Sequence, residues 1–194
     1  MLFLHFFPSY EERNDFQNFI QHLPRTGWVL RNVKDPETVS GHMYRMAMMM
    51  FLIEDNDIDK SRCMEMALVH DLAESIIGDF TPYCGISPEE KYKRECEAMK
   101  EIGELVGKNG DYINTLFLEF EEQKTKEAKL IKEFDLFDMA LQAYEYEKKE
   151  KAPGRLQEFI DSTSNRFSHP LICKLYSEIL KNREIEISGQ QIGS

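Results

Sequence analysis

The chain has 194 residues, of which 42% are hydrophobic, so it is long enough to bury one substantial core. Asp and Glu total 35 against 24 Lys and Arg, and the formal net charge is −11. That charge disfavours binding to a nucleic acid polymer, because such binding depends on neutralising phosphates with cationic side chains. The N-terminal apolar run is too short to cross a bilayer, and the four cysteines form no C-x-x-C pair. We therefore expect a soluble, intracellular protein of the cytoplasm, without a membrane partner.

Helical periodicity extends through nearly the whole chain, and no sustained alternating pattern indicates a strand. Between the first two predicted helices lies a connector with Pro and Gly, and the second carries methionines at core spacing. Ser87 and Pro88 suit the start of the fourth helix, and Gly107 suits its end. The predicted helices span residues 10–23, 38–54, 59–75, 87–107, 111–123, 125–151, 155–167 and 169–184.

This pattern predicts an all-α fold, a single helical bundle of about eight helices. The domain is expected to cover residues 1–187, with its core at roughly residues 16–182. The polar, glycine-containing segment 188–194 is expected to be a disordered tail.

Two adjacent metal-ligand side chains, His70 and Asp71, end the apolar run of the third predicted helix. A buried imidazole beside a carboxylate is costly unless something pairs them, and a divalent cation would pair both. His42 and an aspartate of the long sixth helix would complete a site of two imidazoles and two carboxylates. Asp135 and Asp138 both lie among apolar residues there, and periodicity does not decide between them. Each residue alone also suits an ordinary cap or hydrogen-bonded pair.

Glu74 follows His70 by four positions and Asp71 by three, so it would share their face of a helix. This placement suits a general base that takes a proton from a water activated by the ion. We expect one divalent ion per site, and the ligand set suits Mn²⁺, Co²⁺, Fe²⁺, Zn²⁺ or Mg²⁺.

A dianionic phosphate ester would need more positive charge than an ion already neutralised by its ligands provides. Arg45 lies one turn after His42 and is expected to face the same cavity. Solvated helix faces are the alternative for each of the candidate cations, which are Arg31, Arg45, Lys91 and Arg94.

A known family shares the ordered set His42, His70-Asp71 and Asp135, together with several longer segments. These segments are RTGWVLRNV, PETVSGHMYRMA, ALVHDLAESIIGD, EEKYKRE, EAKLIKEFD, LQAYEYE and PGRLQEF. The set resembles the H…HD…D signature of the HD-domain superfamily of metal-dependent phosphohydrolases. The segments resemble the eukaryotic HD domain-containing protein 2 group, relatives of the bacterial HD-type 5′-deoxynucleotidases.

The resemblance implies that Asp135, rather than Asp138, is a metal ligand and that Glu74 activates the attacking water. It also implies that Asp79 contacts the sugar of a nucleotide. The full set of metal ligands that it implies is His42, His70, Asp71 and Asp135.

In the bacterial relatives an aromatic residue before the first ligand is thought to crowd the 2′-hydroxyl of a ribose, and Trp28 is the candidate here. The bacterial pattern has an Arg immediately before this Trp, whereas this chain has Gly27. The phosphate-binding arginine is therefore Arg25, Arg31 or neither.

These inferences predict a metal-dependent 5′-deoxynucleotidase, which converts deoxyribonucleoside 5′-monophosphates to deoxyribonucleoside and phosphate with broad base tolerance. The alternatives are a triphosphohydrolase or phosphodiesterase, or a non-enzymatic nucleotide-binding protein with a structural metal. Glu74 and Asp79 together favour catalysis, because a closed structural site needs neither. The resemblance also implies a homodimer, to which the aromatics of residues 2–7 would contribute.

Overall fold

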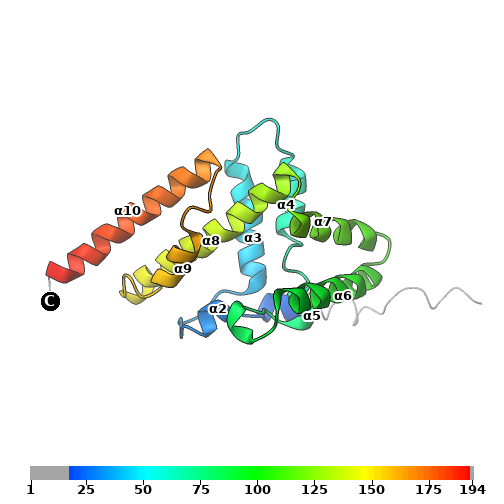
Figure 1. Ribbon diagram of the computed structural model, residues 1–194, viewed down its shortest axis with the longest axis horizontal. Helices are drawn as coiled ribbons and strands as arrows, with labels where there is room; N and C mark the ends of the chain where they lie inside the picture. The colour runs from blue at the N-terminus through cyan, green and yellow to red at the C-terminus, as the bar shows by residue number, and fades with distance from the viewer. Residues whose placement is uncertain (1–17, 193–194) are drawn as a thin grey trace, which may run out of the picture.

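Helices make up the regular structure of residues 18–192, the part of the chain that the computed structural model describes (Figure 1). Within this part the only β contact is an isolated antiparallel bridge between Pro24 and Thr38, so the all-α prediction is confirmed. Residues 18–22 are helical, and η1 and η2 are 3₁₀ helices. The following elements are α2 (Thr26–Val29), α3 (Val39–Met49), η1 (Met50–Leu52), α4 (Lys60–Ala67), α5 (Glu74–Ile77), η2 (Pro82–Cys84), α6 (Pro88–Val106), α7 (Gly110–Glu122), α8 (Lys126–Glu150), α9 (Gln157–Thr163) and α10 (Pro170–Ile192).

Helix α8 is the centre of the fold and contacts α3, α4, α7, α9 and α10. It runs diagonally through the middle of the molecule, with α10 along one side and α3 crossing it (Figure 1). Its apolar residues Ile131 and Phe134 are fully buried, and so is the carboxylate-bearing Asp138. The central helix therefore carries acidic side chains into the interior, where they need partners.

The predicted helix 59–75 is interrupted, which corrects the sequence interpretation. Helix α4 ends at Ala67 and α5 begins only at Glu74. In between, the backbone N–H of Leu72 bonds to the carbonyl of Val69 at 2.9 Å, and the N–H of Glu74 to that of Asp71 at 3.1 Å. Bonds to the third preceding residue wind the backbone more tightly than an α-helix, so the side chains do not follow the directions of one continuous helix.

The last helix extends further than predicted. Helix α10 runs to Ile192 and so includes residues 188–192 of the segment expected to be disordered. Tyr144 of α8 donates a hydrogen bond to Glu186 at 3.0 Å, which holds this end of α10 against α8. Residues 193–194 and the aromatic segment 2–7 lie outside the described residues.

Helices α6 and α7 approach each other closely at Gly103 and Gly110. A methyl group at Gly110 would lie 2.1 Å from the carbonyl oxygen of Gly103, whereas one at Gly103 would meet Gly110 at an ordinary 3.5 Å. We expect Gly110→Ala to lower the free energy of unfolding by about 1–3 kcal/mol in urea denaturation, because the backbone must shift. Gly103→Ala is the matched control and should be neutral or stabilising, since Ala favours a helix. Equal losses in both variants would contradict this account.

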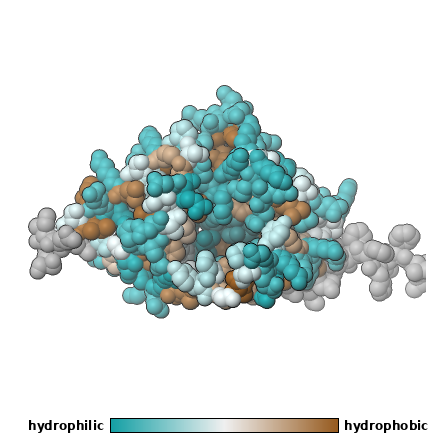
Figure 2. Space-filling view, in the orientation of Figure 1, coloured by the Kyte–Doolittle hydropathy of each residue, from teal (hydrophilic) through white to brown (hydrophobic). Residues whose placement is uncertain are grey.

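The face of the molecule in Figure 2 is mostly hydrophilic, with hydrophobic side chains in scattered patches. Within the described residues, no helix has the length and hydropathy needed to cross a membrane. Four exposed apolar side chains follow one another at helical spacing along α3 and η1. This group, the α3 stripe, consists of Tyr44, Met48, Phe51 and Leu52.

Candidate active site

Three predicted metal ligands converge between α3 and the turn that joins α4 to α5. One ligand atom each from His42, His70 and Asp71 lies within 4.8 Å of the others. Nε2 of His70 is 3.2 Å from Oδ2 of Asp71, and Nε2 of His42 is 3.8 Å from the same oxygen. His70 and Asp71 follow His42 by 28 and 29 positions in the chain, yet all three side chains point toward one small volume.

The tautomer of each imidazole follows from the hydrogen bond that its Nδ1 atom makes. Nδ1 of His70 is 2.9 Å from the carbonyl oxygen of Ala67, which can only accept, so Nδ1 carries the proton. Nδ1 of His42 is 2.6 Å from Oδ2 of Asp138. Both Nε2 atoms are buried, and neither has a hydrogen-bond partner within the described part of the chain. Buried acceptors without partners are costly, and a divalent cation would satisfy both, so the residues fit a metal.

Asp135 reaches the same volume from α8, while Asp138 does not. Oδ1 of Asp135 lies 3.3 Å from Nε2 of His42, and its Oδ2 lies 2.8 Å from Nζ of Lys132. Burial alone would raise the pKa of Asp135, but Lys132 and His42 lower it well below its ordinary value. Asp138 contacts the opposite ring nitrogen, so the two carboxylates that sequence periodicity left open lie on different sides of His42.

Glu74 begins α5 and is almost completely buried, with an exposed fraction of 4%. Its Oε2 has no hydrogen-bond partner among the described residues. Burial, followed by the charges of Asp71 and Asp79, raises its pKa well above the ordinary value. The interruption before α5 means that Glu74 does not share a continuous helix with His70, although it stays close to the cluster.

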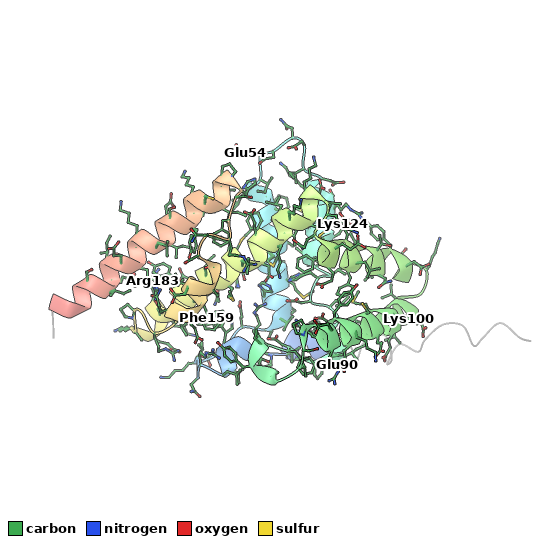
Figure 3. The ribbon with its side chains drawn as sticks, in the orientation of Figure 1. Glu54, Glu90, Lys100, Lys124, Phe159 and Arg183 are labelled. Carbon is green, nitrogen blue, oxygen red and sulfur yellow. The ribbon has the colours of Figure 1, made fainter. Side chains whose placement is uncertain are left out.

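A cavity of about 350 Å³, within the range of small-molecule sites, is connected to this cluster by Arg25, which lines the cavity and lies 3.6 Å from Asp71. Asp79 lines it, and its Oδ2 accepts a hydrogen bond from the backbone N–H of Thr26 at 2.7 Å. Trp28 forms an apolar wall with Phe159, their ring centroids 4.4 Å apart, and Phe159 projects from α9 (Figure 3). The cavity is lined by Arg25, Gly27, Trp28, Arg31, Asp79, Thr81, Pro82, Tyr83, Leu136, Met139, Glu158, Phe159, Ser162 and Arg166.

Comparison with known proteins identifies the family of this chain. The model of a family described as the HD domain matches residues 18–173. The chain belongs to the HD domain family. It is 49% identical over 171 residues to 5′-deoxynucleotidase HDDC2 of Homo sapiens, which covers 88% of this chain and 84% of that protein. It is 35% identical over 178 residues to 5′-deoxynucleotidase YGK1 of Saccharomyces cerevisiae, covering 87% and 82%.

Solved structures with the same fold are also similar to this HD domain. A conserved hypothetical protein from Pyrococcus furiosus has a TM-score of 0.70 and 28% identity, covering 91% of this chain and 99% of that chain. The HD domain-containing protein YGK1 has a TM-score of 0.66 and 28% identity, covering 93% and 90%. The recognition of an all-α HD domain from sequence motifs is thereby confirmed.

The two arginines that the sequence offered for phosphate binding, Arg31 and Arg25, differ in the groups that already bind them. Arg31 lies on the cavity wall, where Glu158 holds it by two hydrogen bonds of 2.5 and 2.6 Å and the ring of Tyr83 lies 4.5 Å away. Arg25 also lines the cavity, and its Nη1 is 3.6 Å from Oδ2 of Asp71. Arg25 is therefore the arginine that borders both the cavity and the ligand cluster.

Arg45 is not among the residues that line the cavity, although its position one turn after His42 suggested that it would be. Its Nε is 2.5 Å from Oδ1 of Asp138, and its Nη2 is 2.5 Å from Oε2 of Glu37. Sequence reasoning missed this cluster, because no local spacing links Glu37 in a connector to Asp138 in α8.

The other two candidate cations are occupied on α6. Lys91 lies 3.1 Å from Glu95, and Arg94 lies 2.7 Å from Glu90. The pair of Arg94 and Glu90 is 44% exposed at both side chains, as is usual on a solvated helix face. Lys91 is more buried: burial would lower its pKa, but the charges of Glu95, Glu74 and Asp71 raise it, so Lys91 lies near the ligand cluster.

Proposed function

We propose that this protein is a metal-dependent 5′-deoxynucleotidase, an enzyme that hydrolyses deoxyribonucleoside 5′-monophosphates to deoxyribonucleoside and phosphate. The observation that carries the proposal is the pair of buried Nε2 atoms that face two carboxylates near a cavity of about 350 Å³ and have no hydrogen-bond partner among residues 18–192. Relatives named 5′-deoxynucleotidases, 35–49% identical to this chain, support the substrate class. Broad base tolerance is part of the proposal.

One divalent ion would be held by His42, His70, Asp71 and Asp135, with Mn²⁺, Co²⁺, Fe²⁺, Zn²⁺ and Mg²⁺ as the candidates. When bound, such an ion supplies positive charge for phosphate oxygens and makes a water more acidic. The ionised state of Asp135, maintained by Lys132, leaves its carboxylate ready to bind a cation.

Glu74 is proposed as the general base that takes the proton from the attacking water. Its Oε2 is buried and without a hydrogen-bond partner in the described structure, and burial raises the pKa of this carboxyl, which makes its ionised form a stronger base toward that water. Burial also excludes competing solvent from the carboxylate, which keeps the proton transfer within the site.

Arg25 is proposed to bind the phosphate, in place of Arg45. A dianionic phosphate is best held by a guanidinium, which offers several N–H donors in one plane. Arg25 borders both the cavity and Asp71, whereas Arg45 is bound by Asp138 and Glu37. Arg31 also lines the cavity, but its Nε and Nη2 are both bound by Glu158.

Asp79 and Trp28 are proposed to recognise the sugar. The backbone N–H of Thr26 holds Oδ2 of Asp79, which fixes the carboxylate and leaves Oδ1 to accept from a sugar hydroxyl. The indole of Trp28 donates to Oε1 of Glu37 at 3.1 Å and packs against the ring of Tyr146 at 5.3 Å. A wall held on two sides cannot easily move away from a 2′-hydroxyl.

The test is phosphate release from paired deoxyribo- and ribonucleoside 5′-monophosphates. Metal-stripped protein receives each candidate ion in turn, and Asp71→Ala serves as the blank. Metal-restored release that favours the deoxy substrate and is absent in the variant would support the proposal. Equal release from both sugars would refute the sugar assignment, and no release with any ion bound would refute the reaction.

We also propose a homodimer, with the α3 stripe as its contact surface. Phe51 is 70% exposed and Tyr44 62%, which is costly for a row of side chains on one helix face. We expect sedimentation of the wild type as a dimer at micromolar concentration and of Phe51→Glu as a monomer. Ile185→Glu, at an exposed position on α10, is the control and should stay dimeric. A monomeric wild type would contradict the proposal.

A further inference from the structure

Asp138 is a fully buried carboxylate that contacts the proposed metal ligand His42 at the ring nitrogen that does not face the metal site. Its Oδ2 is 2.6 Å from Nδ1 of His42. Arg45 donates two hydrogen bonds to the same carboxylate, with Nε 2.5 Å from Oδ1 and Nη2 2.6 Å from Oδ2. Both oxygens are therefore satisfied, which offsets the cost of burying the charge.

We infer that Asp138, clamped by Arg45, is a positioning residue that sets the tautomer and orientation of His42 for the metal. An ionised carboxylate can only accept, so the shared proton belongs to Nδ1 of His42. In the neutral imidazole, Nε2 then keeps its lone pair and points to the side where Asp71 and Asp135 lie, 3.8 and 3.3 Å away. The inference rests on the proposed metal site and concerns how that site is built.

The two imidazoles differ in what orients them. Nδ1 of His70 bonds to the backbone carbonyl of Ala67, and this contact survives any side-chain substitution. Nδ1 of His42 bonds to the side chain of Asp138. A single substitution at Asp138 therefore loosens one ligand and leaves the other as an internal reference.

Glu37 extends the clamp to the wall of the cavity. Its Oε2 is 2.5 Å from Nη2 of Arg45, and its Oε1 accepts from the indole N–H of Trp28 at 3.1 Å. A continuous chain of hydrogen bonds thus connects Trp28, Glu37, Arg45, Asp138 and His42. Arg45, expected from the sequence to bind substrate, takes part in this chain through two carboxylates.

The test measures metal binding and the histidine tautomer, neither of which requires a nucleotide. In metal-free wild type, at a pH high enough for His42 to be neutral, ¹⁵N chemical shifts should show its single ring proton on Nδ1. In Asp138→Asn, whose amide can donate as well as accept, we expect mixed protonation of His42 and an unchanged His70. The dissociation constant for Mn²⁺ or Co²⁺, measured by chelator competition, should rise about 10–100-fold.

Glu147→Gln is the matched control, because Glu147 is another buried carboxylate held by an arginine, Arg183. It should leave the metal dissociation constant and the His42 signals unchanged. Equal weakening in both variants would overturn the inference, since it would reflect a general loss of packing. So would wild-type affinity in Asp138→Asn.

If Asp138→Asn does not fold, the wild-type spectrum still decides, because a neutral His42 that carries its proton on Nε2 would overturn the inference. Tight metal binding without phosphate release by the wild type would instead refute the proposed function and leave the positioning role of Asp138 standing.

Discussion

Glu74→Gln is expected to lower turnover of a deoxyribonucleoside 5′-monophosphate by about 10²–10⁴-fold, the usual contribution of a general base. Gln keeps the shape of the side chain, and its amide cannot take a proton from water. Since no proposed metal ligand changes, the dissociation constant for the metal should stay close to that of the wild type. Initial rates of phosphate release and chelator competition on the same preparation separate the two effects.

Glu127→Gln is the control for this experiment. Glu127 is similarly buried, but its Oε1 accepts a hydrogen bond from the backbone N–H of Asp59, away from the ligand cluster. Its substitution should leave turnover unchanged. Full activity in Glu74→Gln with metal bound would remove Glu74 from the proposed mechanism.

Arg183→Met is expected to lower the free energy of unfolding by about 3–5 kcal/mol at neutral pH, because it leaves the charge of Glu147 buried without its partner. Nε of Arg183 is 2.7 Å from Oε2 of Glu147, and both side chains are at most 5% exposed. Arg183 lies on α10 toward α8 and α9 (Figure 3), and it also donates to Gln157 of α9 at 2.6 Å. The pair therefore joins three helices.

The deficit should depend on pH. Burial would raise the pKa of Glu147, but Arg183 and the backbone N–H of Leu156 lower it below the ordinary value of 4.5. A lowered pKa in the folded state contributes stability above pH 4.5, and that contribution is lost as the pH falls through the folded pKa. Urea denaturation should therefore show the full difference between wild type and variant at pH ~7 and a smaller one below pH ~4.

Two controls test the cause of this loss. Adding Glu147→Leu to Arg183→Met removes the stranded charge and should restore part of the lost stability. Lys93→Met breaks a pair with Glu97 in which both side chains are 68% exposed, and it should cost less than about 1 kcal/mol. A loss in Arg183→Met no larger than in Lys93→Met would contradict the account.

Local sequence signals predicted the helix ends well where capping residues determine them. The helix expected from Ser87 to Gly107 is α6, Pro88–Val106, with Ser87 accepting from the N–H of Glu90 and Gly107 at a φ of +77°. Such signals depend on residues within one or two turns, which a single sequence contains in full.

Contacts between distant residues could not be predicted in the same way. Arg45 meets Asp138 across 93 positions, and Arg31 meets Glu158 across 127. Many acidic side chains compete for each arginine in a chain of this charge, and only packing selects among them. The interruption at His70 and Asp71 was also missed, since Leu68, Leu72 and Ala73 around them are good helix formers and tertiary contacts override their preference.

The hydrogen-bond chain from Trp28 to His42 has a consequence for redesign of the site. An engineer who shortens Trp28 to admit a ribonucleotide would also release Glu37, and through it Arg45 and Asp138. Sugar preference and metal retention would then change together. A library of variants in the cavity wall should therefore be screened at a limiting metal concentration, at which a loss of metal affinity lowers the measured activity.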